Sequence, residues 1–250
     1  MSLPMNHKVF LALGSNINPV ENFRACLKLL QEKFDIWEFS PTYETPPVGY
    51  TEQAAFLNAA VCIHTELDPV SVKAILQSIE NELGRVRDPN NKNAPRTIDL
   101  DIALWDDAIF TYGEKNWRIP DPDILRFIHL AQPLADLEPD YVYPGATDTL
   151  TSIAEKLPMS GIARRDDVWI DLPFLIRVHV DFNSLSMDGE MVRINTHTNK
   201  HLLGILHPGL RVILYASHDL EVEAIIHREK YKQDQDLWYG IPDWDTRHDL

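Results

Sequence analysis

Two aspartates separated by a single leucine, Asp99 and Asp101, are the residues of this 250-residue chain whose spacing points most directly to chemistry. Residues 97–104 alternate between apolar and polar side chains with period two, which predicts a β-strand with one buried face. Both carboxylates then lie on the other face, with their backbone positions about 6.6–6.8 Å apart, and can converge on one site. Neighbouring carboxylates repel unless a cation lies between them, and oxygen ligands beside substrate phosphates favour Mg²⁺. A solvated face of an edge strand would show the same pattern, so both interpretations stand at this point.

A cationic loop leads directly into this strand. Arg85, Arg87, Lys92 and Arg96 fall within a stretch that is rich in Asn and Pro. The planar fork of a guanidinium group suits bidentate contacts with phosphate. A flexible cationic loop followed by a pair of carboxylates is therefore typical of a phosphoryl-transfer site. The alternative is a surface loop whose arginines pair with nearby acidic side chains.

The strands expected to position these residues are marked by apolar runs. Buried strands are predicted at 9–13 and 56–67, with a β-rich stretch at 36–43 and a short strand at 109–112. Gly14-Ser15-Asn16 is expected to break the first strand. This segment either brings the backbone close to a ligand or makes a tight turn before the next helix. The sequence does not choose between these two roles.

Helices are predicted between the strands. The first begins at Asn18, whose side chain is expected to cap it with Glu21 completing a capping box. A second helix is expected over 68–84, beginning at an aspartate followed by proline and ending at a glycine. A third is expected near 149–157. Together with the strands, these helices predict an α+β domain.

The remainder of the chain has a different character. Helical periodicity stops at 158–165, which we interpret as a linker between two domains, 1–160 and 165–250. Strands are expected in the second domain at 175–180, 191–195, 211–216 and 220–227, with a hairpin turn at Asp188-Gly189. Its aromatic segment 238–244 is expected to pack over a small β-barrel or a neighbouring subunit, so a homodimer through this domain is one expectation. Seven histidines are scattered here without a metal-binding spacing: His179, His197, His201, His207, His218, His227 and His248.

Charge and composition exclude several classes of protein. Asp and Glu number 38 against 23 Lys and Arg, a formal charge of -15, which disfavours non-specific binding to nucleic acid or an anionic membrane. No apolar run approaches the roughly 20 residues of a membrane span, and the first residues lack the apolar core of a signal peptide. Cys26 and Cys62 fall in apolar segments without disulfide or metal spacing. We therefore expect a cytoplasmic protein with both thiols reduced.

Taken together, five segments closely resemble the 6-hydroxymethyl-7,8-dihydropterin pyrophosphokinase family of folate synthesis. The resemblance covers about residues 8–158. It rests on Leu-Ala-Leu-Gly-Ser-Asn at 11–16, Tyr-x-Thr-Pro-Pro-x-Gly at 43–49, Phe-Leu-Asn-Ala-Ala-Val at 56–61, Gly-Arg-Val-Arg at 84–87 and Pro-Arg-Thr-Ile-Asp-Leu-Asp-Ile at 95–102.

The resemblance implies a ferredoxin-like, three-layer fold and a magnesium-dependent reaction. Pyrophosphate would pass from ATP to the hydroxymethyl group of the pterin, with release of AMP. By resemblance, Asp99 and Asp101 hold two Mg²⁺ ions, and Arg85 and Arg96 meet the phosphates as catalytic residues. No general base is evident; Asp101 is the candidate proton acceptor.

The resemblance also assigns the binding residues. The pterin pocket is expected to comprise Thr45, Pro46, Val48, Phe56 and Asn58. The nucleotide is expected to face Gln77, Glu80, Arg87, Lys92 and Ile102.

Several positions depart from the family pattern. Lys92-Asn93-Ala94 stands where Arg-Trp-Gly is frequent, and Asp121 replaces a common histidine. Phe127 stands where an arginine is frequent. His129 stands where a second pterin-stacking aromatic is expected, and we hypothesise that it fills that role. Two rival functions are a catalytically inactive pterin- or nucleotide-binding module of the same fold, and a metal-dependent nucleotidyl or glycosyl transferase.

Overall fold

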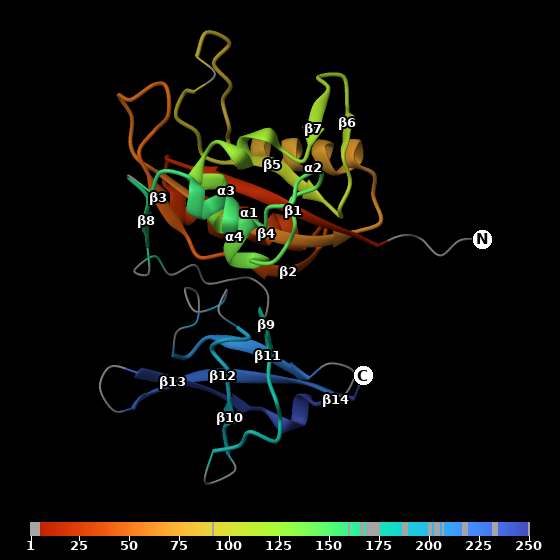
Figure 1. Cartoon of the computed structure of the whole chain (residues 1–250), viewed down its shortest axis with the longest axis vertical. Helices are drawn as coiled ribbons and strands as arrows, with labels where there is room; N and C mark the ends of the chain where they lie inside the picture. The colour runs from red at the N-terminus through yellow and green to blue at the C-terminus, as the bar shows by residue number, and fades with distance from the viewer. Residues whose placement is uncertain are drawn as a thin grey trace, which may run out of the picture. The chain divides into compact units, whose positions relative to one another are not determined.

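The computed structural model describes residues 6–91, 93–159, 161–165, 168, 176–186, 190–199, 202, 206, 208–216, 220–231 and 235–249. The chain divides into two compact units, Met1–Phe174 and Leu175–Leu250. Each unit has its own sheet (Figure 1).

The first unit is built on an antiparallel sheet of order β5-β1-β4-β3-β8, with β2 also paired to β4. Its strands are β1 (His7–Ser15), β2 (Asp35–Phe39), β3 (Tyr43–Thr45), β4 (Phe56–Thr65), β5 (Asp99–Trp105) and β8 (Ala163–Arg164). The register sets Gly14 of β1 opposite both Asn58 of β4 and Asp99 of β5. Residues from three distant segments therefore form one row across the sheet.

Helices cover both faces of this sheet (Figure 1). One face packs against α1 (Pro19–Gln31) and α2 (Pro69–Glu82), and the other against α3 (Ile128–Leu137) and α4 (Leu150–Lys156). The second face is filled by small or aromatic strand residues such as Phe10 and Ala60, which pack against Leu134 and Ile153. Near the end of β1 this face carries Gly14 instead, and there the layer of helices leaves space for a site.

The helix termini agree only in part with the sequence analysis. The side chain of Asp68 caps α2 by accepting hydrogen bonds from the backbone N–H groups of Val70 and Ser71, at 2.9 and 3.1 Å, as predicted. The prediction of a capping box at Asn18 was wrong. Asn18 adopts a left-handed conformation with φ of 41°, from which its side chain makes no capping hydrogen bond. Gly84, with φ of 74°, follows the end of α2 in the conformation that favours glycine.

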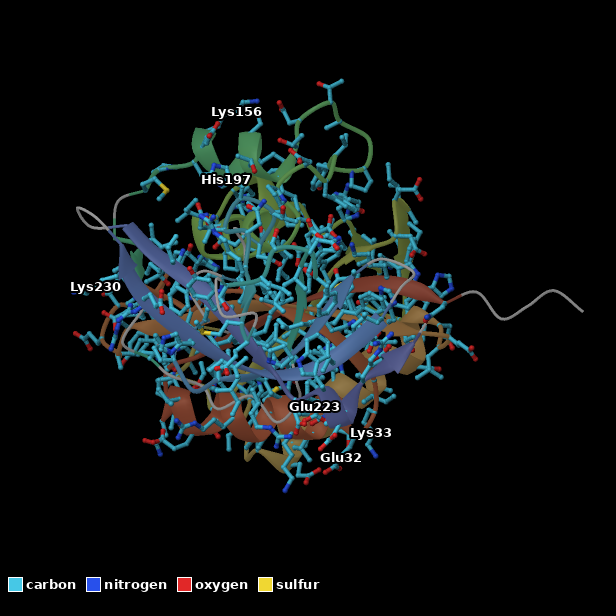
Figure 2. All side chains as sticks on the ribbon, turned by 90° about the horizontal axis from the view of Figure 1, so that it is seen from below. Glu32, Lys33, Lys156, His197, Glu223 and Lys230 are labelled. Carbon is cyan, nitrogen blue, oxygen red and sulfur yellow. The ribbon has the colours of Figure 1, made fainter. Side chains whose placement is uncertain are left out.

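Helix α3 was not predicted, because it contains Pro133. Proline removes one backbone donor and disfavours a helix interior. The structure tolerates it because the helix buries an apolar face against β4, and the packing of Leu130, Ala131 and Leu134 compensates the lost hydrogen bond. Helix α4 begins at the N-cap Thr149 and ends at Lys156, which is labelled in Figure 2 and forms an ion pair with Asp148.

A small hairpin stands beside the edge strand β5. It consists of β6 (Phe110–Tyr112) and β7 (Trp117–Ile119) and is followed by a 3₁₀ helix, η1 (Pro122–Leu125). Its turn includes Gly113, with φ of 67°, where a Cβ atom would lie 2.5 Å from the ring of Trp117. The glycine thus lets the indole fold back over the hairpin.

The second unit is a β-sheet of order β10-β13-β12-β11-β9, with β14 paired to β12. Its elements are β9 (Ile176–His179), β10 (Val192–Arg193), β11 (Arg211–Ala216), β12 (Leu220–Tyr231), β13 (Gln235–Pro242), η3 (Trp244–Thr246) and β14 (His248–Asp249). Among the strand pairs formed by the described residues of this unit, β9 and β11 pair in parallel and the others are antiparallel. The four predicted strands are present, and the aromatic segment that we expected to pack over a barrel forms most of β13. Asp188-Gly189 lies outside the described residues.

The boundary between the units differs from the predicted linker. Residues 163 and 164 form β8, which pairs with β3, and the division falls later, between Phe174 and Leu175. Two residues are too short a strand to give a periodic signal, so their pairing was invisible in the sequence. Within the described part of the chain, none of the helices has the length and apolar character of a membrane span.

Candidate active site

A cavity of about 430 Å³ lies near the end of β1, on the sheet face that carries both aspartates. Four segments distant in sequence line it, within residues 12–14, 45–58, 93–101 and 121–130. They meet because the register places Gly14 between Asn58 and Asp99. The cavity is therefore a product of strand pairing.

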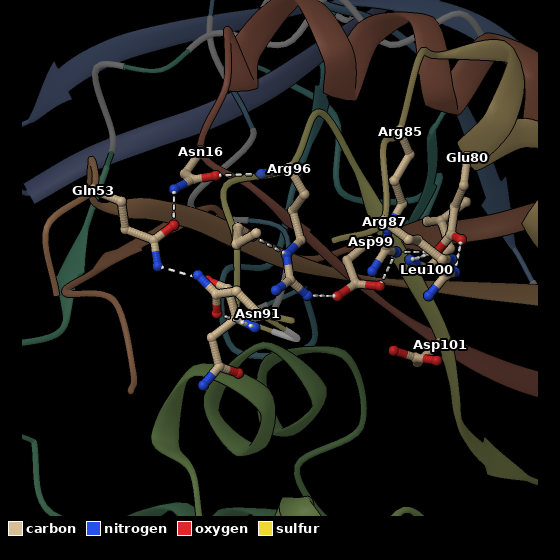
Figure 3. Close-up of polar contacts among 12 residues, drawn as sticks. Asn16, Gln53, Glu80, Arg85, Arg87, Asn91, Arg96, Asp99, Leu100 and Asp101 are labelled. Atoms are coloured by element: carbon tan, nitrogen blue, oxygen red, sulfur yellow. Dashed lines mark hydrogen bonds and ion pairs between the residues drawn. The ribbon is translucent and has the colours of Figure 1, made fainter. Parts of the chain in front are cut away.

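Asp99 is held by two guanidinium groups of the cationic loop. Its carboxylate accepts hydrogen bonds from Nη1 of Arg85 and Nη1 of Arg96, as Figure 3 shows. Burial alone would raise the pKa of Asp99, but the two positive charges outweigh burial and hold the pKa below its ordinary value. Asp99 is thus ionised at neutral pH, and charge-assisted bonds join the loop to the strand.

Asp101 is paired with a lysine of α2. Nζ of Lys73 lies 2.6 Å from Oδ1 of Asp101 and 2.7 Å from the carbonyl oxygen of Leu100. The Lys73 side chain is 6% exposed, whereas that of Asp101 is 48% exposed. The aspartate therefore keeps solvent-accessible surface in the cavity while the lysine lies behind it.

Glu80 supports the two arginines that follow α2. It accepts hydrogen bonds from Arg85 and Arg87, each at 2.5 Å, and from the backbone N–H of Leu100 at 2.9 Å (Figure 3). Burial raises the pKa of Glu80 above its ordinary value, since the side chain is only 1% exposed. Arg85 consequently lies between two carboxylates, those of Glu80 and Asp99.

The backbone of Arg96 is anchored by the turn after β1. Oδ1 of Asn16 accepts a hydrogen bond from the backbone N–H of Arg96 at 2.8 Å, and the carbonyl oxygen of Arg96 accepts one from the N–H of Asn16 at 3.1 Å. Nδ2 of Asn16 donates to Gln53 at 2.8 Å, and Gln53 donates to the carbonyl oxygen of Asn93 at 2.9 Å. Asn16 therefore ties the cationic loop to the segment before β4. The break predicted at Gly14-Ser15-Asn16 was wrong for its first two residues, because Gly14 and Ser15 continue β1 and pair with Asn58 and Leu57.

An amide and several rings form the opposite wall. Nδ2 of Asn58 donates to Oγ1 of Thr45 at 2.9 Å, and both residues are buried. The guanidinium carbon of Arg96 lies 5.7 Å from the centre of the Phe56 ring. The rings of Phe127 and His129 are stacked, with centroids 5.3 Å apart. Burial lowers the pKa of His129, so the imidazole is neutral at pH 7 and offers a flat, uncharged face.

Asp121 adds a third carboxyl group to the cavity. Burial raises its pKa to about 6, and the nearby charge of Asp101 acts in the same direction. The N–H of Asp123 donates to Asp121 at 2.9 Å, as at a helix N-cap. This group therefore changes charge just below neutral pH.

Most of the sequence-predicted site residues meet at this cavity. Those that line it are Thr45, Pro46, Val48, Phe56, Asn58, Arg96, Asp99, Asp101 and His129. Arg85, Arg87 and Glu80 stand behind Asp99. Glu80, Gln77 and Ile102 are not among the lining residues, so their contact with nucleotide stays a prediction. Lys92 lies outside the described residues.

Sequence reasoning missed Lys73, Gln53, Asp123 and Leu130. Lys73 is buried next to Val72 of the apolar stripe of α2, but a lysine beside such a stripe does not by itself signal burial. The other three belong to loops or helix ends whose neighbours depend on tertiary contacts.

The two aspartates fit a magnesium site of the kind that substrate phosphates complete. Mg²⁺ in such sites binds through one or two carboxylates, with water and phosphate supplying the other ligands. Asp99 and Asp101 present oxygen ligands in one cavity. No group of three or more His, Cys, Asp or Glu arranged for a metal occurs among the residues that the structure describes.

The sequence of this chain is similar to those of known proteins. A family model for 7,8-dihydro-6-hydroxymethylpterin-pyrophosphokinase (HPPK) matches residues 10–139. The 2-amino-4-hydroxy-6-hydroxymethyldihydropteridine pyrophosphokinase of Bacillus subtilis is 40% identical over 136 residues, which are 53% of this chain and 79% of that protein. The protein of the same name from Pseudomonas aeruginosa is 33% identical over 163 residues, or 64% of this chain and 98% of that protein.

Longer relatives match over a smaller share of their length. The folic acid synthesis protein fol1 of Schizosaccharomyces pombe is 35% identical over 160 residues, which are 63% of this chain but 21% of that protein. The solved wild-type HPPK-DHPS of Plasmodium falciparum with SDX-DHP superimposes with a TM-score of 0.50 at 14% identity, over 62% of this chain and 45% of that chain, and this likeness concerns the fold alone. The match to the family model and the shared length with the bacterial enzymes place this chain in the 7,8-dihydro-6-hydroxymethylpterin-pyrophosphokinase family.

Proposed function

We propose that the chain transfers pyrophosphate from ATP to 6-hydroxymethyl-7,8-dihydropterin in folate synthesis, with Mg²⁺ as cofactor and AMP as the second product. The observation that carries this proposal is that Asp99, Asp101 and Arg96 line the same cavity as Asn58 and Thr45, whose amide and hydroxyl groups are hydrogen-bonded to each other. The carboxylates and the guanidinium group would handle phosphate, and the neighbouring rings and amide would bind a heterocycle, as a reaction between the two substrates requires.

The arginines are the phosphate-binding groups of this proposal. Arg85 and Arg96 pair with Asp99, and a triphosphate would offer each guanidinium group stronger bidentate acceptors. Arg96 would stabilise the charge that develops on the transferred group, while its backbone is held by Asn16. Asp99 and Asp101 would hold Mg²⁺, expected as two ions, which neutralises phosphate charge when bound.

The pterin would lie between rings and an amide. Phe56 and His129 offer aromatic faces, and a neutral imidazole stacks without introducing a buried charge. The Asn58 amide, oriented by the hydrogen bond that its Nδ2 donates to Oγ1 of Thr45, can read the hydrogen-bonding edge of the heterocycle. A proton must leave the attacking hydroxyl, and Asp101 is the acceptor that we propose. His129→Ala is expected to weaken pterin binding, and unchanged affinity would count against the stacking role.

We further infer that the catalytic domain, expected at residues 1–160, extends through β8 and has a ferredoxin-like fold, and that the second unit, Leu175–Leu250, is an appended domain. The order β5-β1-β4 with β2 beside β4, and helices after β1 and β4, supports this assignment.

For the appended domain we propose self-association. Ile225 and Ile241 are paired across β12 and β13 and are 49% and 43% exposed. Light scattering of the full chain and of Ile225→Glu tests this, and a wild-type monomer would refute it.

One assay separates the proposal from its rivals. The protein is incubated with ATP, Mg²⁺ and the pterin, and nucleotide products are separated by chromatography. The proposal expects AMP that depends on the pterin. Pterin binding without AMP would indicate an inactive binding module, and any other nucleotide product would favour a different transferase.

Two variants assign the residues. Asp99→Ala is expected to abolish turnover through loss of metal, and near-normal AMP formation would refute that role. Arg96→Ala is expected to slow transfer by about 10²–10³ while sparing pterin binding, because a charged transition-state contact of this kind is worth that much. The matched control is Arg118→Ala, an exposed arginine of β7 outside the cavity lining.

A further inference from the structure

Lys73 is a buried ammonium group directed at a residue of the active site. It projects from α2, is 6% exposed at the side chain, and reaches both Asp101 and the carbonyl oxygen of Leu100. The ring of Trp117 in β7 lies 5.7 Å from Nζ. Burying an ammonium group is costly unless it is paired and hydrogen-bonded, and here a carboxylate, a carbonyl oxygen and an aromatic face surround it.

The same helix secures the edge of the sheet at the residue between the two aspartates. Strand β5 is an edge strand, so the backbone N–H and C=O of Leu100 have no further strand to pair with on that side. Glu80 accepts from the N–H at 2.9 Å, and Lys73 donates to the C=O at 2.7 Å. Residues 73 and 80 are two turns apart on one face of α2. Leu100 is thus fixed from both sides, and the aspartates that flank it are fixed with it.

The charges around the dicarboxylate are balanced by Lys73. The described carboxylates are Glu80, Asp99, Asp101 and Asp121, and the cations that face them are Lys73, Arg85, Arg87 and Arg96. Asp123, also at the cavity, pairs with Arg126 at 2.9 Å. Apart from the Asp123–Arg126 pair, four positive groups therefore face four acidic groups. A divalent cation alone gains little binding energy in such a site. A divalent cation that arrives with a triphosphate is accompanied by the negative charge of the phosphates.

We propose that Lys73 is a positioning residue that holds Asp101 in place and weakens the binding of divalent cations until nucleotide is present. This inference rests on the proposed pyrophosphokinase function. One carboxylate oxygen of Asp101 is occupied by the ammonium group, so a metal ion would share this ligand with a fixed positive charge. Even with the screening of bulk water, a unit charge so close to a metal ligand weakens a divalent cation on the order of tenfold.

The test is Mn²⁺ binding to the full chain, followed by the electron paramagnetic resonance signal of the free ion. Lys73→Gln removes the charge and keeps a donor for the carbonyl oxygen of Leu100, and Lys73→Met removes both. The matched control is Lys156→Gln. Lys156 also lies 2.6 Å from an aspartate oxygen, that of Asp148, but it is 60% exposed at the surface of α4 (Figure 2). Thermal melting in EDTA confirms that each variant is folded.

Without nucleotide, Lys73→Gln is expected to bind Mn²⁺ on the order of tenfold more tightly than the wild type, and Lys156→Gln is expected to bind as the wild type does. With α,β-methylene-ATP the difference should fall below about threefold, because the lysine then attracts phosphate as much as it repels metal. Equal affinities of wild type and Lys73→Gln without nucleotide would overturn the role of Lys73 and leave the pyrophosphokinase proposal intact. If neither protein binds Mn²⁺ even with the nucleotide analogue, both proposals are overturned. Lys73→Met repeats the comparison should Lys73→Gln fail to fold.

Discussion

Replacing Glu80 should destabilise the first unit by an amount that the structure allows us to work out. Its carboxylate is 1% exposed and accepts from three donors: the Leu100 N–H, Arg85 and Arg87. In Glu80→Ala the Leu100 N–H loses this partner on the edge of the sheet, which costs about 1–3 kcal/mol. Arg85, 8% exposed, keeps Asp99 but loses its second carboxylate. Arg87 is 57% exposed and is resolvated by water at little cost.

Breaking a buried ion pair outright costs about 3–5 kcal/mol, so with Arg85 still paired we expect about 3 kcal/mol in total. For a unit of this size each kcal/mol shifts the melting temperature by about 2–4 °C, which predicts a fall of about 6–12 °C. The measurement is differential scanning calorimetry of the metal-free protein at pH 7.

Two further variants isolate the cause. Glu82→Ala changes an exposed glutamate of the same helix and should alter stability by no more than about 0.5 kcal/mol. Glu80→Gln keeps an oxygen for the Leu100 N–H but loses the charge, so it should fall between Glu80→Ala and the wild type. If Glu80→Ala melts within the range of Glu82→Ala, the edge of β5 is not secured by this side chain and the reasoning fails.

Three other perturbations follow from the contacts of the site. Burial raises the pKa of Asp121 from its ordinary 3.8 to about 6, so the folded state binds this proton more tightly than the unfolded state, and stability is lost as the pH rises from about 4 through 6. Asp121→Asn should therefore stabilise the metal-free protein by at most about 3 kcal/mol at pH 8 and hardly at all at pH 4. Equal effects at both pH values in denaturant titrations would contradict this. The hydroxyl of Tyr43 donates to Asp136 at 2.6 Å, so Tyr43→Phe should cost about 1–2 kcal/mol of unfolding free energy, and a loss below about 0.3 kcal/mol would show that the bond contributes nothing net. Asn16→Ala should slow AMP formation about tenfold with little change in pterin affinity, since it frees the backbone of Arg96; an unchanged rate in a single-turnover assay would exclude this anchoring role.

Much of the site was predictable because its signals are local. The period-two alternation at 97–104 is enough to put Asp99 and Asp101 on one face, and the N-cap at Asp68 follows from one aspartate and one proline. Several strands of both units, such as β4 and β11, were likewise marked by their apolar runs, since the side-chain pattern of a strand does not depend on which strand lies beside it. The strands β7, β8, β13 and β14 were not predicted. The failed cap at Asn18 marks the limit of such signals: the backbone there is left-handed, and no residue type announces that choice.

Which residues became neighbours was decided by tertiary structure. Gly14 stands between Asn58 and Asp99 only because β1 pairs with both β4 and β5, and Lys73 reaches Asp101 only because β5 is the edge of the sheet next to α2. Helix α3 exists in spite of Pro133 because the sheet offers it an apolar face. Local periodicity specifies which face of a strand or helix is buried; strand order and the identity of the edge depend on pairings between segments far apart in the chain, whose energies no short stretch of sequence contains.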